Sequence, residues 1–117
     1  MKYQVHITER AQRDLESAAD YIEYTLLNPT AADELLDAAE DALASLSDMP
    51  QRIMLVTDEV LAAWGIRFIL VKNYLGFYVI DEARQVVHII RFLYMKRDWQ
   101  AILRCDAASE EPRPYIK

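Results

Sequence analysis

The 117-residue chain has little of what several classes of protein depend on. Its single cysteine, Cys105, allows no internal disulfide, fits a reducing compartment and has no neighbouring base, so we expect an ordinary thiol. Two glycines are too few for a glycine-rich phosphate-binding loop. His6 and His88 have no metal-ligand spacing with the cysteine or with each other. No run is long and apolar enough for a signal peptide or a membrane span. We therefore expect a cytoplasmic protein without a metal, cofactor or membrane partner.

Charge is unevenly distributed along the chain. Residues 1–63 carry four Lys and Arg against thirteen Asp and Glu, a net charge of −9, whereas residues 64–117 carry nine against six, a net charge of +3. The two halves add to the overall charge of −6. An acidic chain is a poor non-specific binder of nucleic acid, so any such binding must depend on the C-terminal half.

A strand and two helices are predicted in the acidic half. Residues 3–7 alternate as a strand does, and Thr8 is suited to cap the helix that follows. Asn28-Pro29 ends this helix, and Thr30 is expected to cap a second, antiparallel helix. The helical spacing predicts inward faces made of Ala11, Leu15, Ala18, Ile22 and Leu26, and of Ala32, Leu35, Leu36, Ala39, Leu43 and Leu46. The acidic outer face of the second helix is either a solvated surface or a site, and its carboxylates have no paired acid–base geometry.

Three β-branched and aromatic runs predict an antiparallel meander, since the connections at 72–73 and 81–85 are too short for parallel crossovers. A two-residue loop at Lys72-Asn73 would pair Arg67 with Tyr78. Pairing Ile80 with Val86 would place His88 opposite Tyr78, and Arg91 opposite Leu75. One face would then carry Arg67, Tyr78 and His88, and the other Ile66, Phe68, Leu70, Leu75, Phe77, Val79, Val87, Ile89, Leu93 and Arg91. The helices can cover one face, so the other is a candidate partner surface.

The predicted fold class is α+β. An antiparallel sheet, made of the N-terminal strand and the meander, packs on the N-terminal helical hairpin, with a short C-terminal helix over 99–104 capped by Asp98. Residues 51–63 are expected to be a connector, either extended or with one helical turn. The domain is predicted to span residues 1–105, and residues 106–117 to form a flexible tail.

The strongest functional signal is the cluster from Tyr94 to Trp99, where two cations lie between aromatic residues directly after a strand. It is either a binding site or a turn in which Arg97 pairs with Asp98. Arg67 either pairs with a carboxylate or stacks on Tyr78, or it contacts a substrate. His88 is either a satisfied sheet histidine or a general base.

The opening segment and the strand strings carry a family resemblance. The chain resembles the RelE/ParE superfamily of bacterial type II toxins over residues 2–104. The segments that carry the resemblance, with the helical hairpin between the first and the others, are residues 3–9, 65–67, 71–81 and 87–99. The strings Asn-Tyr-Leu-x-Phe-Tyr-x-Ile-Asp and Arg-x-x-Tyr-x-x-Arg-Asp are fairly specific for the superfamily. The resemblance implies a plasmid-stabilisation toxin that a cognate antitoxin neutralises in a hetero-oligomer. RelE-like members cleave mRNA on the ribosome, and ParE-like members poison DNA gyrase.

The residues that matter for cleavage separate the two branches. RNA cleavage through the 2′-hydroxyl needs a base, cations for the phosphate and an acid. Arg97 matches the basic position of RelE-like enzymes after the last strand, but Leu75 stands where they carry an arginine, and Leu103 falls near their C-terminal tyrosine. If the chain is a nuclease, Arg91, Tyr94 and Arg97 are the catalytic candidates, with His88 as a second proton carrier.

The resemblance favours a ParE-like gyrase inhibitor that acts by protein–protein contact and is not an enzyme. The alternatives are a ribosome-dependent mRNA endonuclease and an inactive toxin-fold protein that persists as a binding partner. The residues expected to contact the target or the antitoxin are Arg67, Leu75, Phe77, Tyr78, Lys96, Arg97 and Trp99.

Overall fold

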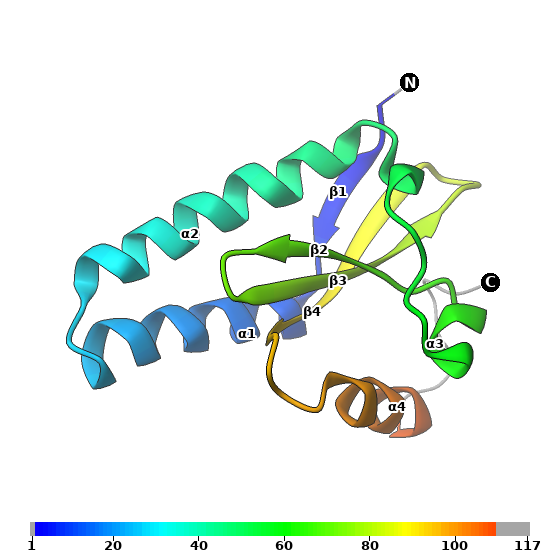
Figure 1. Ribbon diagram of the computed structural model, residues 1–117. Coiled ribbons are helices and arrows are strands. Elements are labelled where there is room, and N and C mark those ends of the chain that lie inside the picture. Colours follow the sequence, from blue (N-terminus) through cyan, green and yellow to red (C-terminus); the bar gives the residue numbers. More distant parts are fainter. Residues whose placement is uncertain (1, 110–117) are drawn as a thin grey trace.

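A computed structural model describes the backbone of residues 2–109 and the side chains as far as residue 106. It has the α+β class predicted from the sequence (Figure 1). The elements in chain order are β1 (Gln4–Ile7), α1 (Glu9–Asp20), the π-helical turn η1 (Tyr21–Thr25), α2 (Pro29–Ala44), the 3₁₀ turns η2 (Ser45–Ser47) and η3 (Pro50–Arg52), α3 (Glu59–Ala63), β2 (Arg67–Val71), β3 (Tyr74–Asp81), β4 (Val86–Tyr94) and α4 (Trp99–Ser109).

The four strands form one sheet in the order β1-β4-β3-β2. Strands β2, β3 and β4 make the predicted antiparallel meander. Strand β1, which was expected to extend an antiparallel sheet, pairs with β4 in parallel instead, so the sheet is mixed. A parallel neighbour needs a long connection, and the helical hairpin and the meander between β1 and β4 supply it.

The strand register was predicted correctly at one turn and incorrectly at the next. The two-residue loop pairs Val71 with Tyr74 and Arg67 with Tyr78, as expected. The β3–β4 turn closes one residue later in β3 than predicted, since Asp81 rather than Ile80 pairs with Val86, and a bulge at Phe77/Tyr78 shifts the register by one further residue. Both expected pairs, Tyr78 with His88 and Leu75 with Arg91, are therefore wrong. The observed partners across β3 and β4 are Val79 with His88, Tyr78 with Ile89, Phe77 with Arg91 and Leu75 with Leu93.

The helical hairpin covers one face of the sheet. Thr8 caps α1 as predicted, but Asn28 rather than Thr30 caps α2, because Pro29 already occupies its first turn. Val87 and Ile89 lie on this face and pack with residues of the hairpin. The predicted register had placed both residues on the opposite face. Gly76 allows the close approach of α2, since a Cβ atom there would lie 3.2 Å from a methyl group of Leu43.

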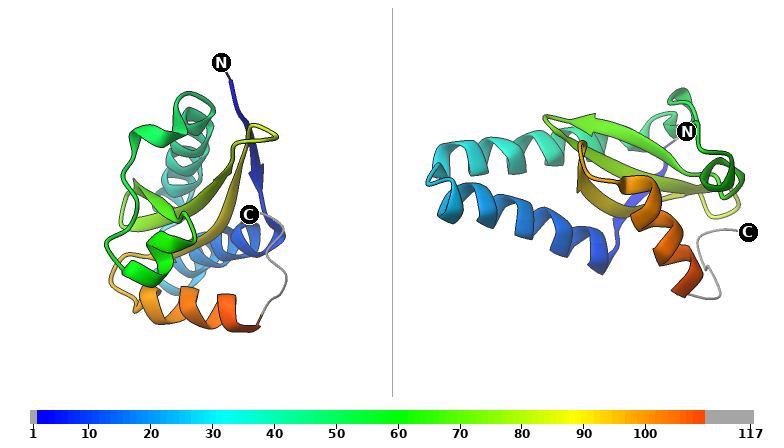
Figure 2. Two further views of the ribbon diagram at one scale, coloured as in Figure 1. Left: turned by 90° about the vertical axis from the view of Figure 1, so that its right-hand side faces the viewer. Right: turned by 60° about the horizontal axis from the view of Figure 1, so that its bottom comes forward.

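The tip of the hairpin extends beyond the sheet (Figures 1 and 2). Leu26 was expected to be buried but is 55% exposed, and Leu36 is also exposed. The helical period places both residues on the apolar side, but the sheet is too short to cover the tip. Large hydrophobic side chains are exposed there, namely Tyr21, Tyr24, Leu26 and Leu27.

The opposite face of the sheet is covered too, so the expected open apolar face is wrong. The connector, α3 and α4 close over it, with Val56, Leu61 and Leu103 in the same cluster as the sheet residues. The carboxylate of Asp58 caps α3 by accepting hydrogen bonds from the amides of Val60 and Leu61. The buried sheet residues of this cluster are Ile66, Leu75, Phe77, Val79, Ile90 and Leu93.

Helix α4 begins where predicted and ends later. The carboxylate of Asp98 accepts a hydrogen bond of 3.2 Å from the amide of Ala101. The helix continues to Ser109 rather than ending at Arg104, so Asp106 belongs to a helix and not to a flexible tail. The remainder of the predicted tail, from residue 110 onward, lies outside the described residues.

Candidate functional site

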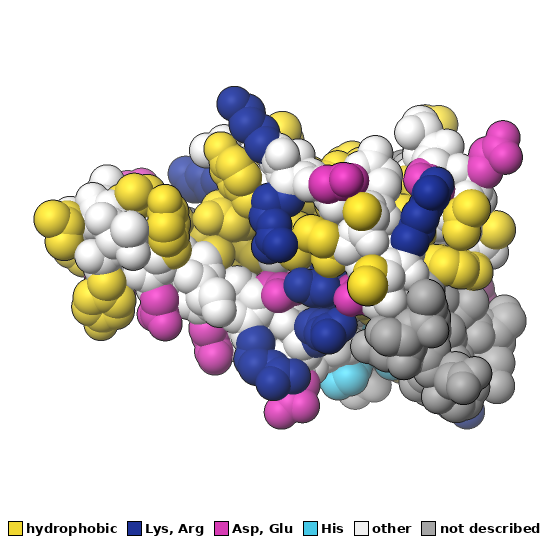
Figure 3. Space-filling model, turned by 90° about the horizontal axis from the view of Figure 1, so that it is seen from below, with side chains coloured by type: hydrophobic (Ala, Val, Ile, Leu, Met, Phe, Trp, Pro, Cys, Tyr) yellow, Lys and Arg dark blue, Asp and Glu magenta, His cyan; other side chains and the backbone are white. Residues whose placement is uncertain are grey.

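A groove of about 610 Å³ lies between the first helix and the end of the meander. Its walls come from α1 and η1 on one side, and from the start of β3, the end of β4 and the turn after β4 on the other. On the surface seen from below, Lys and Arg side chains gather in the middle of the molecule beside a hollow with hydrophobic side chains (Figure 3). The groove is lined by Asp14, Ser17, Ala18, Tyr21, Ile22, Leu26, Asn73, Tyr74, Phe92, Leu93, Tyr94 and Arg97.

Aromatic rings form the sheet side of the groove. The ring of Tyr74 stacks on Phe92 at a centroid distance of 5.2 Å and meets Tyr94 edge-on at 5.6 Å. Burial, and then the nearby Tyr94 and Tyr21, raise the pKa of the Tyr74 hydroxyl. This hydroxyl stays protonated at neutral pH, so it can donate a hydrogen bond but cannot act as a base.

Arg97 lies at the groove because backbone hydrogen bonds fix the conformation of the turn after β4. The amide of Met95 donates to the carbonyl of Asn73 at 2.9 Å, and the amide of Arg97 donates to the carbonyl of Tyr94 at 3.0 Å. Within the described part of the chain, neither Arg97 nor Lys96 makes an ion pair, so the alternative in which Arg97 pairs with Asp98 is not formed. Both cations are exposed and can bind an anionic group of a partner.

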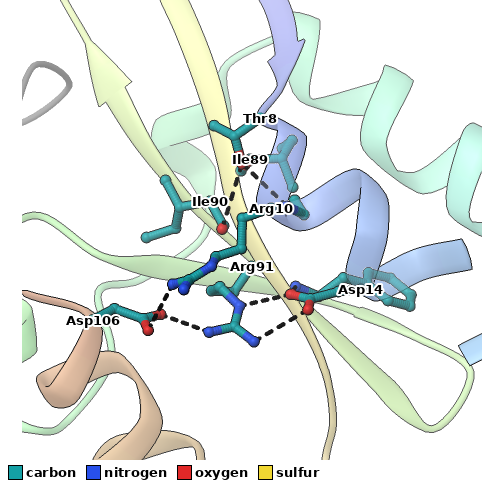
Figure 4. A network of polar contacts seen from close by, with 9 residues as sticks. Thr8, Arg10, Asp14, Ile89, Ile90, Arg91 and Asp106 are labelled. Carbon is teal, nitrogen blue, oxygen red and sulfur yellow. Dashed lines mark hydrogen bonds and ion pairs between the residues drawn. The ribbon is translucent and has the colours of Figure 1, made fainter. Parts of the chain in front are cut away.

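Arg91 lies behind the groove in a network of charges (Figure 4). Its guanidinium donates to the two carboxylate oxygens of Asp14 at 2.7 and 3.1 Å, and to Asp106 at 2.7 Å. Asp14 also accepts from the amide of Phe92 at 3.0 Å, and Asp106 pairs with Arg10 at 2.9 Å. Burial opposes the charged form of Arg91, but the hydrogen bonds that its guanidinium donates to both carboxylates outweigh burial and raise the pKa of Arg91. Two carboxylates thus already neutralise this cation.

Most of the other predicted contact residues belong to the core. Leu75, Phe77 and Tyr78 are buried, so their side chains offer no surface to a partner in this arrangement. The Tyr78 hydroxyl donates to the carbonyl of Pro50 at 2.8 Å, and burial raises its pKa to about 12. The indole of Trp99 packs on Phe77 at 5.2 Å and contacts Phe68, which joins α4 to the sheet.

Arg67 is half-buried beside the connector. Its guanidinium donates to the carbonyl of Ile53, and its buried Nε has no hydrogen-bond partner among residues 2–106. Arg67 therefore does not form the carboxylate pair that was one of its expected roles. It is also not an exposed cation that a partner could reach.

Sequence reasoning missed the helix side of the groove. Asp14, Ala18 and Tyr21 recur at four and three residues, so they share one face of the first helix. That spacing could have indicated a stripe running from a charged to an aromatic residue. The groove itself depends on how far the hairpin reaches past the sheet, which no local pattern indicates.

The described part of the chain shows no metal cluster and no membrane helix. Between residues 2 and 109, no three or more His, Cys, Asp or Glu side chains are grouped so that they could hold a metal ion. None of the helices over the same range is long and apolar enough to cross a membrane.

Comparisons with known proteins agree with the strand motifs. A family model described as the ParE toxin of the type II toxin-antitoxin system, parDE, matches residues 5–99. The chain belongs to the ParE toxin family. This confirms the resemblance to RelE/ParE toxins and favours the ParE branch. No curated protein matches this ParE-family chain.

Two solved structures share the fold of this ParE-family toxin. One is described as a chromosomal ParDE TA system from P. aeruginosa; it is 15% identical with a TM-score of 0.66, covering 81% of this chain and 98% of its own. The other is the toxin–antitoxin complex RelBE2 from Mycobacterium tuberculosis, 25% identical with a TM-score of 0.56, covering 80% of this chain and 99% of its own.

Proposed function

We propose that this toxin inhibits DNA gyrase by protein–protein contact and is neutralised by a cognate antitoxin. The observation that carries the proposal is the ParE family match over residues 5–99. The contact surface is the groove between the first helix and the end of β4. Arg97 in the groove and the exposed Lys96 next to it in the chain bind acidic groups of the target, and the tyrosines of the groove supply apolar contact area.

The chemistry of the groove supports contact over RNA cleavage. A nuclease needs a base and several unpaired cations around one phosphate. Here Tyr74 is held protonated, Arg91 is neutralised by Asp14 and Asp106, and Leu75 is buried in the core. Arg97 and Lys96 remain as cations, which suffice for binding an acidic surface.

An antitoxin partner is supported by the kind of assembly in which both structural neighbours were solved. Their titles describe a ParDE toxin–antitoxin system and a RelBE2 toxin–antitoxin complex. The exposed hydrophobic tip of the hairpin, at Tyr24 and Leu27, adjoins the groove and gives such a partner additional apolar area.

The mRNA endonuclease is the second candidate, and one observation favours it. Tyr94 and Arg97, two of the three predicted catalytic residues, line the same groove. A phosphate beside Arg97 would place Tyr94 near the reacting oxygens.

Pulse labelling distinguishes the two functions. After the chain is induced alone in a bacterium, incorporation of labelled thymidine is expected to fall before that of labelled methionine. Arg97→Ala should remove the effect, whereas Arg84→Ala, an exposed change at the far β3–β4 turn, should preserve it. An earlier fall in methionine incorporation would overturn the gyrase proposal in favour of mRNA cleavage.

A further inference from the structure

The tip of the helical hairpin carries a hydrophobic patch that the rest of the fold leaves uncovered. The four side chains of this tip patch are between 53% and 80% exposed, and they are Tyr21, Tyr24, Leu26 and Leu27. Tyr21 and Leu26 also line the groove, so the tip patch and the groove form one continuous surface. Single exposed hydrophobic residues are ordinary, but several large ones gathered at one place are typical of a surface that binds a partner.

Leu27 is an unfavourable residue at its position for two reasons. Its backbone lies in the left-handed region with a φ of 56°, which glycine and asparagine adopt at lower cost than leucine. Its side chain is 80% exposed, so burial within the chain does not compensate for this conformation. Strained residues of this kind are found at functional sites, and a contact with another molecule would explain the leucine.

The hairpin that carries the tip patch has negative side chains and no positive ones. Residues 14–51 include ten Asp and Glu but no Lys, Arg or His. Glu23 and, more weakly, Asp20 raise the pKa of the Tyr24 hydroxyl, so both carboxylates lie beside this ring of the patch. Figure 3 shows acidic side chains along the hairpin and the Lys and Arg side chains nearer the middle of the molecule. The carboxylates at this end of the hairpin that form no ion pair within residues 2–106 are Asp20, Glu23, Asp33 and Glu34.

These charges determine what kind of molecule can cover the tip patch. A second copy of the chain would bring another acidic hairpin, and the surface of an anionic membrane would be repelled as well. A protein segment with Lys and Arg beside its apolar side chains is attracted instead. The tip consists of the end of α1, the turn η1 and the start of α2, so it has no open strand edge, and a helix that offers side chains is the binding mode that fits.

We infer that the tip patch binds an amphipathic protein helix whose apolar face is bordered by Lys and Arg, with Tyr24 and Leu27 as the main contacts. The inference rests on the antitoxin part of the proposed function, for which it specifies the chemistry of the segment that covers the tip. It does not depend on the proposed action on gyrase. The continuous surface then attracts opposite charges at two places, since Arg97 in the groove attracts acidic groups and the tip attracts basic ones.

The test is binding to the full chain of a fluorescent peptide of about 18 residues, with leucine on one face of its helix and lysine along the borders of that face. Fluorescence anisotropy is expected to show binding of this peptide, and binding about tenfold weaker or less when glutamate replaces its lysines. Leu27→Asn should weaken binding of the lysine peptide by about tenfold or more, because asparagine keeps the left-handed backbone and removes the apolar contact. Met54→Ser is the matched control, since this methionine is 84% exposed in the connector, and the variant should bind as the parent does.

Equal binding of the two peptides, or binding that Leu27→Asn leaves unchanged, would overturn the inference. So would a dimer of the chain alone in sedimentation that Leu27→Asn dissociates, because the patch would then bind a second copy. Flotation with phosphatidylglycerol vesicles that depends on Leu27 would assign the patch to a membrane and would overturn it too. Circular dichroism checks that each variant remains folded. Gyrase is absent from these assays, so their failure is distinguishable from failure of the gyrase proposal, which a supercoiling assay measures.

Discussion

The charge network around Arg91 gives the most exacting test of the structure. The side chains of Arg91, Asp14 and Asp106 are 13%, 16% and 21% exposed, so the network is largely shielded from water. Removing one partner of a buried ion pair costs up to about 3–5 kcal/mol. In Asp14→Ala, Arg91 loses two hydrogen bonds and keeps one to Asp106, and the amide of Phe92 loses its acceptor. Domains of this size unfold with about 5–15 kcal/mol, so Asp14→Ala should remove a large part of the stability.

The two carboxylates are not equivalent, and this sharpens the prediction. Asp14 holds Arg91 through two oxygens and also accepts from the amide of Phe92, whereas Asp106 makes one bond to Arg91. Asp106→Ala should therefore cost less, about 1–2 kcal/mol, because Arg91 keeps Asp14. Asp14→Asn should fall between the two, since the amide oxygen can still accept from Phe92.

Urea unfolding followed by circular dichroism measures these differences, with the slope of the transition as the check that each variant unfolds in two states. The order Asp14→Ala, Asp14→Asn, Asp106→Ala is expected, from the largest loss to the smallest. A loss below about 1 kcal/mol for Asp14→Ala would refute the network, because that is the value of an exposed ion pair.

Three further predictions concern the core and His88. Tyr78→Phe should lower the free energy of unfolding by about 1–2 kcal/mol in urea titrations, because the buried carbonyl of Pro50 loses its donor, and an unchanged midpoint would contradict this hydrogen bond. Because burial lowers the pKa of His88 in the folded state, the unfolded chain binds more protons, so the free energy of unfolding should fall as the pH drops through about 6.5. His88→Gln should flatten that dependence, and an equally steep curve in the variant would assign it to other groups. Gly76→Val should cost about 1–3 kcal/mol, because its methyl groups meet Leu43 of α2, and a thermal transition equal to that of the parent would show that the helix can move away.

Local sequence signals predicted the strand pairing correctly where the connection between two strands is short. The two-residue loop at Lys72-Asn73 fixes the β2–β3 register, which was predicted correctly. The longer β3–β4 turn leaves the register free by one residue, and the bulge at Phe77/Tyr78 shifts it by one more, so the predicted partners of Tyr78 and Leu75 were wrong. The second sheet face was predicted to be open because the helices can cover only one face, but the connector, α3 and α4 cover it.

In the candidate site too, features that depend on neighbouring residues were predicted, and contacts between distant residues were not. Tyr94 and Arg97 were identified because cations and aromatics are adjacent in the sequence, and both line the groove. The partners that determine the chemistry lie far away in the chain. Asp14 is 77 residues from Arg91, so no spacing rule could pair them.

The central claim is that this ParE-family toxin acts on gyrase, and a supercoiling assay with purified components tests it most directly. The full chain added to gyrase, ATP and relaxed plasmid is expected to block supercoiling, and Arg97→Ala to restore it. The same preparations, added to ribosomes translating a defined mRNA, should leave that mRNA intact. Unimpaired supercoiling together with cleavage of the ribosome-bound mRNA would contradict the account and would make Arg97 and Tyr94 catalytic residues.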